Sequence, residues 1–174
     1  VGSQGGVKQG DKVGIIGFGG LGQIGARVAV LKGAEVYVAE VNESVWPLAE
    51  EAGAAGVARS LTDFPDVKFD VIVDFAGFGT TTAEAVDIIR RDGTVVLVGM
   101  GKLESLINTR SLILNQCNLK GSNGGTKEDI AGVYELMATG DLKPTITAIT
   151  FDEIPEGIDK LRDGKVTGRL VAAF

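Results

Sequence analysis

The sequence predicts an α/β protein whose doubly wound parallel sheet of about six strands is followed by a C-terminal tail of helices and strands. Three observations predict this fold class. Short apolar runs alternate with segments of helical periodicity along most of the 174 residues. Two of these runs, Val71–Val73 and Val95–Val98, are entirely apolar, as parallel strands are when helices cover both faces. A glycine-rich turn connects the first apolar run to the first helical segment.

The first strand–helix–strand unit is complete near residue 40. The run 13–16 ends in a glycine cluster, and apolar residues at helical spacing follow it. Gly33 is expected to end this helix, and the β-rich run 35–40 is expected to form the second strand. The helical spacing is carried by Leu21, Ile24, Val28 and Leu31.

The same alternation continues to Gly121 and then changes. Past that glycine the pattern indicates a tail that we expect to pack outside the main sheet. Before it we expect a helix at 45–51, strands at 56–59 and 70–74, a helix at 82–90, a strand at 94–98, a helix at 111–115 and a strand at 118–121. After it we expect a helix at 127–139, an extended segment at 145–150, a helix at 154–162 and a strand at 169–173.

Composition excludes several classes of function. The chain has 17 basic and 23 acidic residues, a net charge of −6, and no dense run of Lys or Arg, so nucleic acid and anionic membranes are not expected partners. Cys117 is the single cysteine and histidine is absent, so one copy of the chain cannot build a disulfide or a Cys/His zinc cluster. We therefore interpret Cys117 as a core residue.

Nothing in the sequence predicts export or membrane insertion. Residues 1–6 are neither basic nor apolar enough for a signal peptide, and no run of 18 apolar residues occurs. We expect a soluble, cytoplasmic protein.

The strongest motif is the glycine-rich turn Gly17-Phe-Gly-Gly-Leu-Gly22, which matches G-x-G-x-x-G between a predicted strand and a predicted helix. Gly17 would permit the sharp turn, and Gly19 would let the backbone approach a pyrophosphate. Gly22 would let the helix pack closely on the strand. The helix N-terminus would then offer free N–H groups to the phosphates, as in Rossmann-type folds.

Glu40 supplies the second half of this motif. An acidic residue is expected about 20 positions after the glycines, at the end of the second strand, and Glu40 lies there. Its carboxylate would accept hydrogen bonds from an adenosine ribose diol and repel the 2′-phosphate of NADP. The following residues 41–44 contain no Arg or Lys. The sequence therefore favours NAD(H) over NADP(H) as the cofactor.

Two other interpretations stay open at this point. The glycines could serve only a tight turn, with Glu40 as a solvated strand-end residue. A methyltransferase-like adenosine ligand is also possible, although the third glycine is in place and no acidic residue directly precedes Gly17.

Longer segments resemble medium-chain dehydrogenases/reductases of the zinc alcohol dehydrogenase type. The resemblance includes the doubled Gly19-Gly20 followed by Leu21 and spans nearly the whole chain. It is carried by Gln9–Gly22, Ala29–Val36, Phe69–Gly77, Asp92–Gly99, Leu119–Ser122 and Gly164–Val171.

This resemblance implies a set of cofactor contacts. The set includes the glycine turn, with Gly20 and Leu21, and it includes Glu40. It also includes residues that follow the fourth and the fifth strands. Arg169, from the last strand, would reach the pyrophosphate if the tail folds back to the glycine turn. The implied contacts after the strands are Phe75, Ala76, Gly77, Val98 and Gly99.

The resemblance also implies an activity and a domain division. Residues 1–125 would form the NAD-binding Rossmann domain, and 126–174 the tail that joins a catalytic domain in the family. That catalytic domain, with its zinc ligands and proton-relay groups, is missing here, so zinc is expected only there and no catalytic residue can be named. The parent protein would be an NAD-dependent oxidoreductase that transfers hydride between nicotinamide and an alcohol or aldehyde.

The residues leave a second class of function open. A stand-alone NAD(H)-binding module, as in redox-sensing regulatory domains, would explain the absence of histidine, of cysteine pairs and of a proton relay. In the family, the edge strand, here about 118–121, often pairs across a two-fold axis. We therefore expect a homodimer through this strand.

Overall fold

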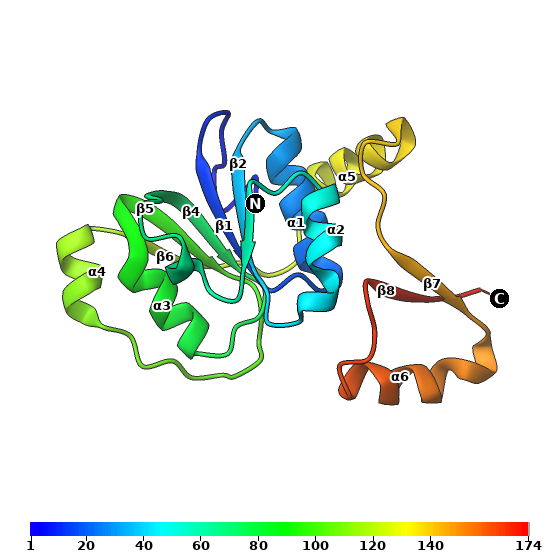
Figure 1. The fold of residues 1–174 in the computed structure, drawn as a ribbon. Coiled ribbons are helices and arrows are strands. Elements are labelled where there is room, and N and C mark those ends of the chain that lie inside the picture. Colours follow the sequence, from blue (N-terminus) through cyan, green and yellow to red (C-terminus); the bar gives the residue numbers. More distant parts are fainter. Residues whose placement is uncertain (174) are drawn as a thin grey trace.

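The computed structural model describes residues 1–173, and its centre is a six-stranded parallel sheet with the order β3-β2-β1-β4-β5-β6 (Figure 1). Every neighbouring pair in this sheet is parallel. The predicted doubly wound sheet is therefore confirmed. Its strands are β1 (Lys12–Ile16), β2 (Glu35–Ala39), β3 (Gly56–Ala58), β4 (Phe69–Asp74), β5 (Ile89–Leu97) and β6 (Asn118–Gly121).

Helices cover both faces of the sheet because the chain winds in two directions from its middle. From β1 it moves outward through α1 (Gly20–Leu31) to β2, and α2 (Trp46–Glu51) then leads to β3. From β4 it moves the other way through α3 (Thr80–Ile88) and α4 (Thr109–Asn115). Right-handed crossovers in opposite directions place the two helix pairs on opposite faces, as Figure 1 shows.

Two apolar clusters fill the space between sheet and helices. One contains Ala29 of α1 and Ala49 of α2 together with Ile15 of the sheet. The other contains Val86 of α3 together with Ile72. Neighbouring strand residues thus contribute to opposite cores, which explains why the central strands are apolar throughout.

The boundary between α3 and β5 differs from the prediction. The helix expected at 82–90 ends at Ile88, and the strand expected at 94–98 already begins at Ile89. Ile89 is only 2 % exposed and pairs with Phe69; the register then shifts before Thr94 pairs with Val71. Asp92, with φ +59°, lies in this interruption. The other predicted boundaries differ from the observed ones by no more than two residues.

The tail forms a separate small unit. β7 (Ile146–Ile149) and β8 (Arg169–Ala172) pair in parallel as a two-stranded sheet, and α6 (Ile154–Arg162) connects them. This unit lies beside the main sheet, as expected (Figure 1). α5 (Lys127–Thr139) leads into it, and short 3-10 turns occur at Glu43–Val45, Leu61–Asp63 and Phe151–Glu153.

The linker between α5 and β7 is anchored on α1. Leu142 is 3 % exposed, and Arg27 Nε of α1 donates to the carbonyl oxygen of Asp141 at 2.8 Å. This contact holds the linker against α1. None of the helices within residues 1–173 combines the length and the apolar character that crossing a membrane requires.

Candidate functional site

A pocket of about 390 Å³ lies at the carboxyl ends of β1 and β4, where the strand order reverses. Open α/β sheets bind ligands at such a switch point, because the loops after the two strands diverge there. Three segments line the pocket: the turn after β1, the turn after β4 and the start of β8. The lining residues are Gly17, Gly19, Gly20, Leu21, Gly22, Phe75, Ala76, Phe78 and Arg169.

The glycine turn has the backbone geometry that its spacing predicts. Gly17 has φ +86°, a conformation that favours glycine. A Cβ atom on Gly22 would lie 1.9 Å from the carbonyl oxygen of Gly17, so only glycine lets α1 approach the strand this closely. A Cβ on Gly19 would meet nothing within 4 Å. Gly19 lines the pocket, so this open space leaves its backbone accessible to a phosphate group.

The N-terminus of α1 is free to bind an anion. Its N-cap residue, Gly19, provides no side-chain hydrogen bond, and no acidic residue lies in the first turn. The first N–H groups of a helix have no intrahelical partner and carry a partial positive charge. The pocket therefore fits a negatively charged group such as a pyrophosphate.

Arg169 is placed at this turn by the folding back of the tail. A Cβ on Gly20 would lie 2.4 Å from Arg169 Cδ, which shows how closely the two residues pack. The backbone N–H of Arg169 donates to Thr145 O at 2.9 Å. Within residues 1–173, no acidic side chain forms an ion pair with the Arg169 guanidinium. Its charge is thus available to the pocket.

The opposite wall is held by Asp74, a residue that the sequence analysis did not select. Asp74 is fully buried, and its Oδ1 accepts hydrogen bonds from the N–H groups of Ala76 at 3.0 Å and Gly77 at 2.8 Å. Its Oδ2 accepts from the hydroxyls of Thr81 and Thr82, each at 2.8 Å. A buried carboxylate needs such donors, and here they fix the turn that carries Phe75 and Ala76.

Four of the expected contact residues do not line the pocket: Glu40, which lies beside it, and three residues of the turns after β4 and β5. Gly77, Val98 and Gly99 pack the turns after β4 and β5 against each other: a Cβ on Gly77 would lie 2.0 Å from Gly99 O. The N–H groups of Val98 and Gly99 both donate to Asp74 O, at 2.9 and 3.0 Å. Phe78, by contrast, lines the pocket and is 52 % exposed, although the sequence analysis did not select it.

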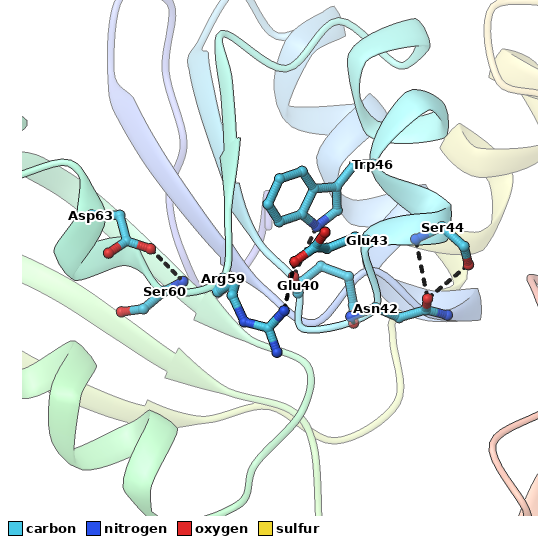
Figure 2. Close-up of polar contacts among 8 residues, drawn as sticks. All are labelled: Glu40, Asn42, Glu43, Ser44, Trp46, Arg59, Ser60 and Asp63. Atoms are coloured by element: carbon cyan, nitrogen blue, oxygen red, sulfur yellow. Dashed lines mark hydrogen bonds and ion pairs between the residues drawn. The ribbon is translucent and has the colours of Figure 1, made fainter.

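Glu40 lies beside the pocket and connects two segments. Its Oε2 accepts from the N–H of Phe18 in the glycine turn at 2.7 Å, and its Oε1 accepts from the N–H of Asn42 at 2.8 Å. The indole Nε1 of Trp46 donates to the backbone oxygen of Glu40 at 2.9 Å (Figure 2). These contacts hold the carboxylate in one place, at the end of β2.

Arg59 lies next to Glu40 and is a second residue that the sequence did not indicate as part of the site. Glu40 N donates to Ala58 O at 2.9 Å, so the ends of β2 and β3 are adjacent. Figure 2 shows the Arg59 guanidinium paired with Glu43, at 2.6 Å. The predicted strand 56–59 placed this arginine at a strand end, but only the pairing of β3 with β2 brings it to Glu40.

Three further features of residues 1–173 bear on the site. No set of three or more His, Cys, Asp or Glu residues within 1–173 is arranged to hold a metal ion. Burial raises the pKa of the Cys117 thiol. Cys117 packs against a buried cluster, as expected, but is only partly buried itself. A second pocket of about 340 Å³ lies between α1, α2 and the 140–145 linker, and Phe18 of the glycine turn is among its lining residues.

Together, the strand order, the glycine turn and the switch-point pocket define a protein of the Rossmann class. The chain belongs to the zinc-binding dehydrogenase family, whose sequence model matches residues 20–139.

Similar proteins agree with this assignment. An alcohol dehydrogenase from Geobacillus stearothermophilus is 28 % identical over 177 residues, covering 95 % of this chain and 51 % of the relative. An alcohol dehydrogenase from a Moraxella species is 28 % identical over 174 residues, covering 96 % and 52 %. The structure of an acetophenone reductase from Geotrichum candidum in complex with NAD superposes with a TM-score of 0.90 at 30 % identity, covering 98 % of this chain and 50 % of that one. The chain thus spans about half the length of the relatives it matches.

Proposed function

We propose that this chain binds NAD(H) and is the cofactor-binding part of an oxidoreductase that transfers hydride between nicotinamide and an alcohol or aldehyde. One observation carries the proposal: the helix N-terminus after Gly19 and the guanidinium of Arg169 converge on one switch-point pocket. The similarity to alcohol dehydrogenases and to an NAD-bound reductase supports it.

Each part of the pocket has a proposed role. The N–H groups at the start of α1, together with Arg169, bind the pyrophosphate. Glu40 accepts hydrogen bonds from the adenosine ribose, using the lone pairs that Phe18 and Asn42 leave free. Phe75 and Ala76 form the wall that orients the nicotinamide half, and Gly77, Val98 and Gly99 support that wall from behind.

Catalysis requires groups that this chain does not provide. In the family, zinc polarises the alcohol oxygen and lowers its pKa, so that hydride can leave the adjacent carbon. Residues 1–173 lack a suitable ligand set, and we place the zinc and the substrate pocket in the rest of the protein. This chain binds and orients the cofactor. Residues 1–125 are the NAD-binding domain, and residues 126–174 are the tail that joins the catalytic domain.

We also propose that two copies associate through β6. This strand ends the sheet order, and all four of its residues are exposed. Ile113 and Leu114 of α4, the helix that precedes β6 in the chain, are 70 % and 59 % exposed and add apolar surface. An exposed edge strand with apolar neighbours is suited to pairing with a second edge.

Titration with NADH and NADPH tests the cofactor proposal. Nicotinamide fluorescence and energy transfer from Trp46, the single tryptophan, report binding without any substrate. We expect NADH to bind more tightly than NADPH, and Glu40→Gln to weaken NADH binding and reduce the preference. Glu156→Gln, on the exposed surface of α6, is the matched control and should bind like the unmodified chain. Binding of neither dinucleotide would refute the proposal.

A further inference from the structure

Arg59 and Glu43 form an ion pair at the place where an adenosine ribose would lie. Arg59 directly follows β3, and Glu43 belongs to the turn after β2. Their charged atoms are 2.6 Å apart, and both side chains are 60 % exposed. Figure 2 shows the pair beside Glu40, on the same edge of the sheet. The only cation in this group is therefore already neutralised by a carboxylate.

The local charge disfavours a phosphorylated ribose for two separate reasons. Glu40 contributes one negative charge and is fixed by two backbone N–H groups, so it cannot turn away from an approaching phosphate. Glu43 contributes a second negative charge and occupies Arg59. An arginine near this position is the group that accommodates the 2′-phosphate in NADP-binding Rossmann folds. Here the arginine is present, but its Nη1 is engaged by the Glu43 carboxylate.

We propose that Arg59 is a masked 2′-phosphate ligand, and that Glu43, by holding it, is a specificity-determining residue for the unphosphorylated dinucleotide. This inference rests on the proposed function, because it requires the adenosine ribose to lie at Glu40. It extends that function by assigning the discrimination between NAD and NADP to the Arg59–Glu43 pair and not to Glu40 alone. Removing the Glu43 carboxylate would free Arg59 to bind a 2′-phosphate, while the charge of Glu40 would continue to repel that phosphate.

The fold should tolerate the substitutions that test this idea. Exposed ion pairs contribute little to stability, because solvent screens them and both side chains lose conformational freedom. Neither side chain of the pair belongs to the buried clusters. Glu43→Gln keeps the size of the side chain, removes its charge and replaces one of its two acceptor oxygens with an amide donor.

The experiment compares two adenosine fragments that differ only in the 2′-phosphate. We would measure the dissociation constants of adenosine 5′-monophosphate and adenosine 2′,5′-bisphosphate by calorimetry. The proteins are the unmodified chain, Glu43→Gln, Arg59→Ala and the double variant. We expect Glu43→Gln to improve binding of the bisphosphate about five- to tenfold, as one screened, charge-assisted contact would do, with little change for the monophosphate. This gain should vanish in the double variant.

Controls separate a specific contact from a general effect of charge. Glu156→Gln removes the same charge from an exposed ion pair on α6 and should leave both constants unchanged. A gain that persists in the double variant, or no gain in Glu43→Gln, would overturn the role of Arg59 even if NADH binds normally. Failure of the unmodified chain to bind NADH would instead refute the proposed function, and the inference with it.

Discussion

Gly20 and Arg169 pack so closely that a Cβ on Gly20 would lie 2.4 Å from Arg169 Cδ and 2.6 Å from Gly168 O. One residue begins α1 and the other begins β8. The absence of a side chain at Gly20 therefore lets the last strand bring its cation to the glycine turn. This contact links the tail to the cofactor pocket.

Gly20→Ala should consequently weaken cofactor binding by displacing Arg169. A charge-assisted hydrogen bond contributes about 1.5–3 kcal/mol, so we expect NADH binding to weaken roughly tenfold or more. Arg169→Ala should have a similar effect, and combining the two should add little, because both remove the same contact. Gly132→Ala is the matched control: its Cβ would meet nothing within 4 Å, and NADH affinity should not change. Fully additive losses in the double variant would contradict this coupling.

Asp74→Asn should destabilise the protein and loosen the turn after β4. The substitution places an amide where Oδ2 accepts from the hydroxyls of Thr81 and Thr82, and it removes the charge that strengthens the two bonds to backbone N–H groups. We expect a loss of about 1–3 kcal/mol in the free energy of unfolding, measured with urea, together with weaker NADH binding.

Asp66→Asn provides the comparison for this variant. Asp66 is exposed on the loop before β4, so its substitution should change stability by less than about 0.5 kcal/mol. If Asp74→Asn unfolds at the same urea concentration as the unmodified chain, the carboxylate does not hold the turn.

The parts of the site that the sequence predicted are those encoded by short spacing. Gly17, Gly19 and Gly22 lie within six positions, and Glu40 follows at the end of the next strand. Because adjacent βα units repeat one geometry, their local pattern is enough to place them. Arg169 came from a family resemblance instead, since no local pattern connects the last strand to the first turn.

The parts that the sequence did not predict depend on tertiary contacts. Arg59 and Phe78 reach the site only through strand pairing and loop packing. The sequence does not reveal that β5 begins at Ile89, because Ile88 and Ile89 continue the apolar pattern of the preceding helix. Ile89 is in fact a strand residue, selected by its pairing with Phe69 rather than by its neighbours.

Cys117 should react slowly with alkylating reagents. Burial raises the pKa of its thiol, so at neutral pH the folded protein holds less of the reactive thiolate than an exposed cysteine would. We expect modification by iodoacetamide at neutral pH to be several-fold slower, about three- to tenfold, than in the urea-unfolded chain. The rate in the folded protein should rise as the pH increases toward the raised pKa. Mass spectrometry gives a direct measurement, because this is the single cysteine. Equal rates in the folded and unfolded chain would contradict the prediction.

Leu119→Lys should disrupt the proposed dimer. Leu119 lies in the middle of β6, is 37 % exposed, and pairs with Val95 on the inner side of the strand. A lysine on an edge strand opposes pairing with a second edge, because two like charges would face each other across the two-fold axis.

Light scattering coupled to gel filtration distinguishes the outcomes. The unmodified chain should elute with twice the mass of one 18.0 kDa chain, and Leu119→Lys should elute as a monomer with an unchanged circular dichroism spectrum. Val171→Lys makes the same change at another exposed strand position, 44 % exposed on β8, and should remain dimeric. If Val171→Lys dissociates while Leu119→Lys does not, the copies pair through the tail rather than through β6. If the unmodified chain is monomeric at every protein concentration, neither β6 nor β8 mediates association. The exposed apolar side chains of α4 would then not be explained by a dimer.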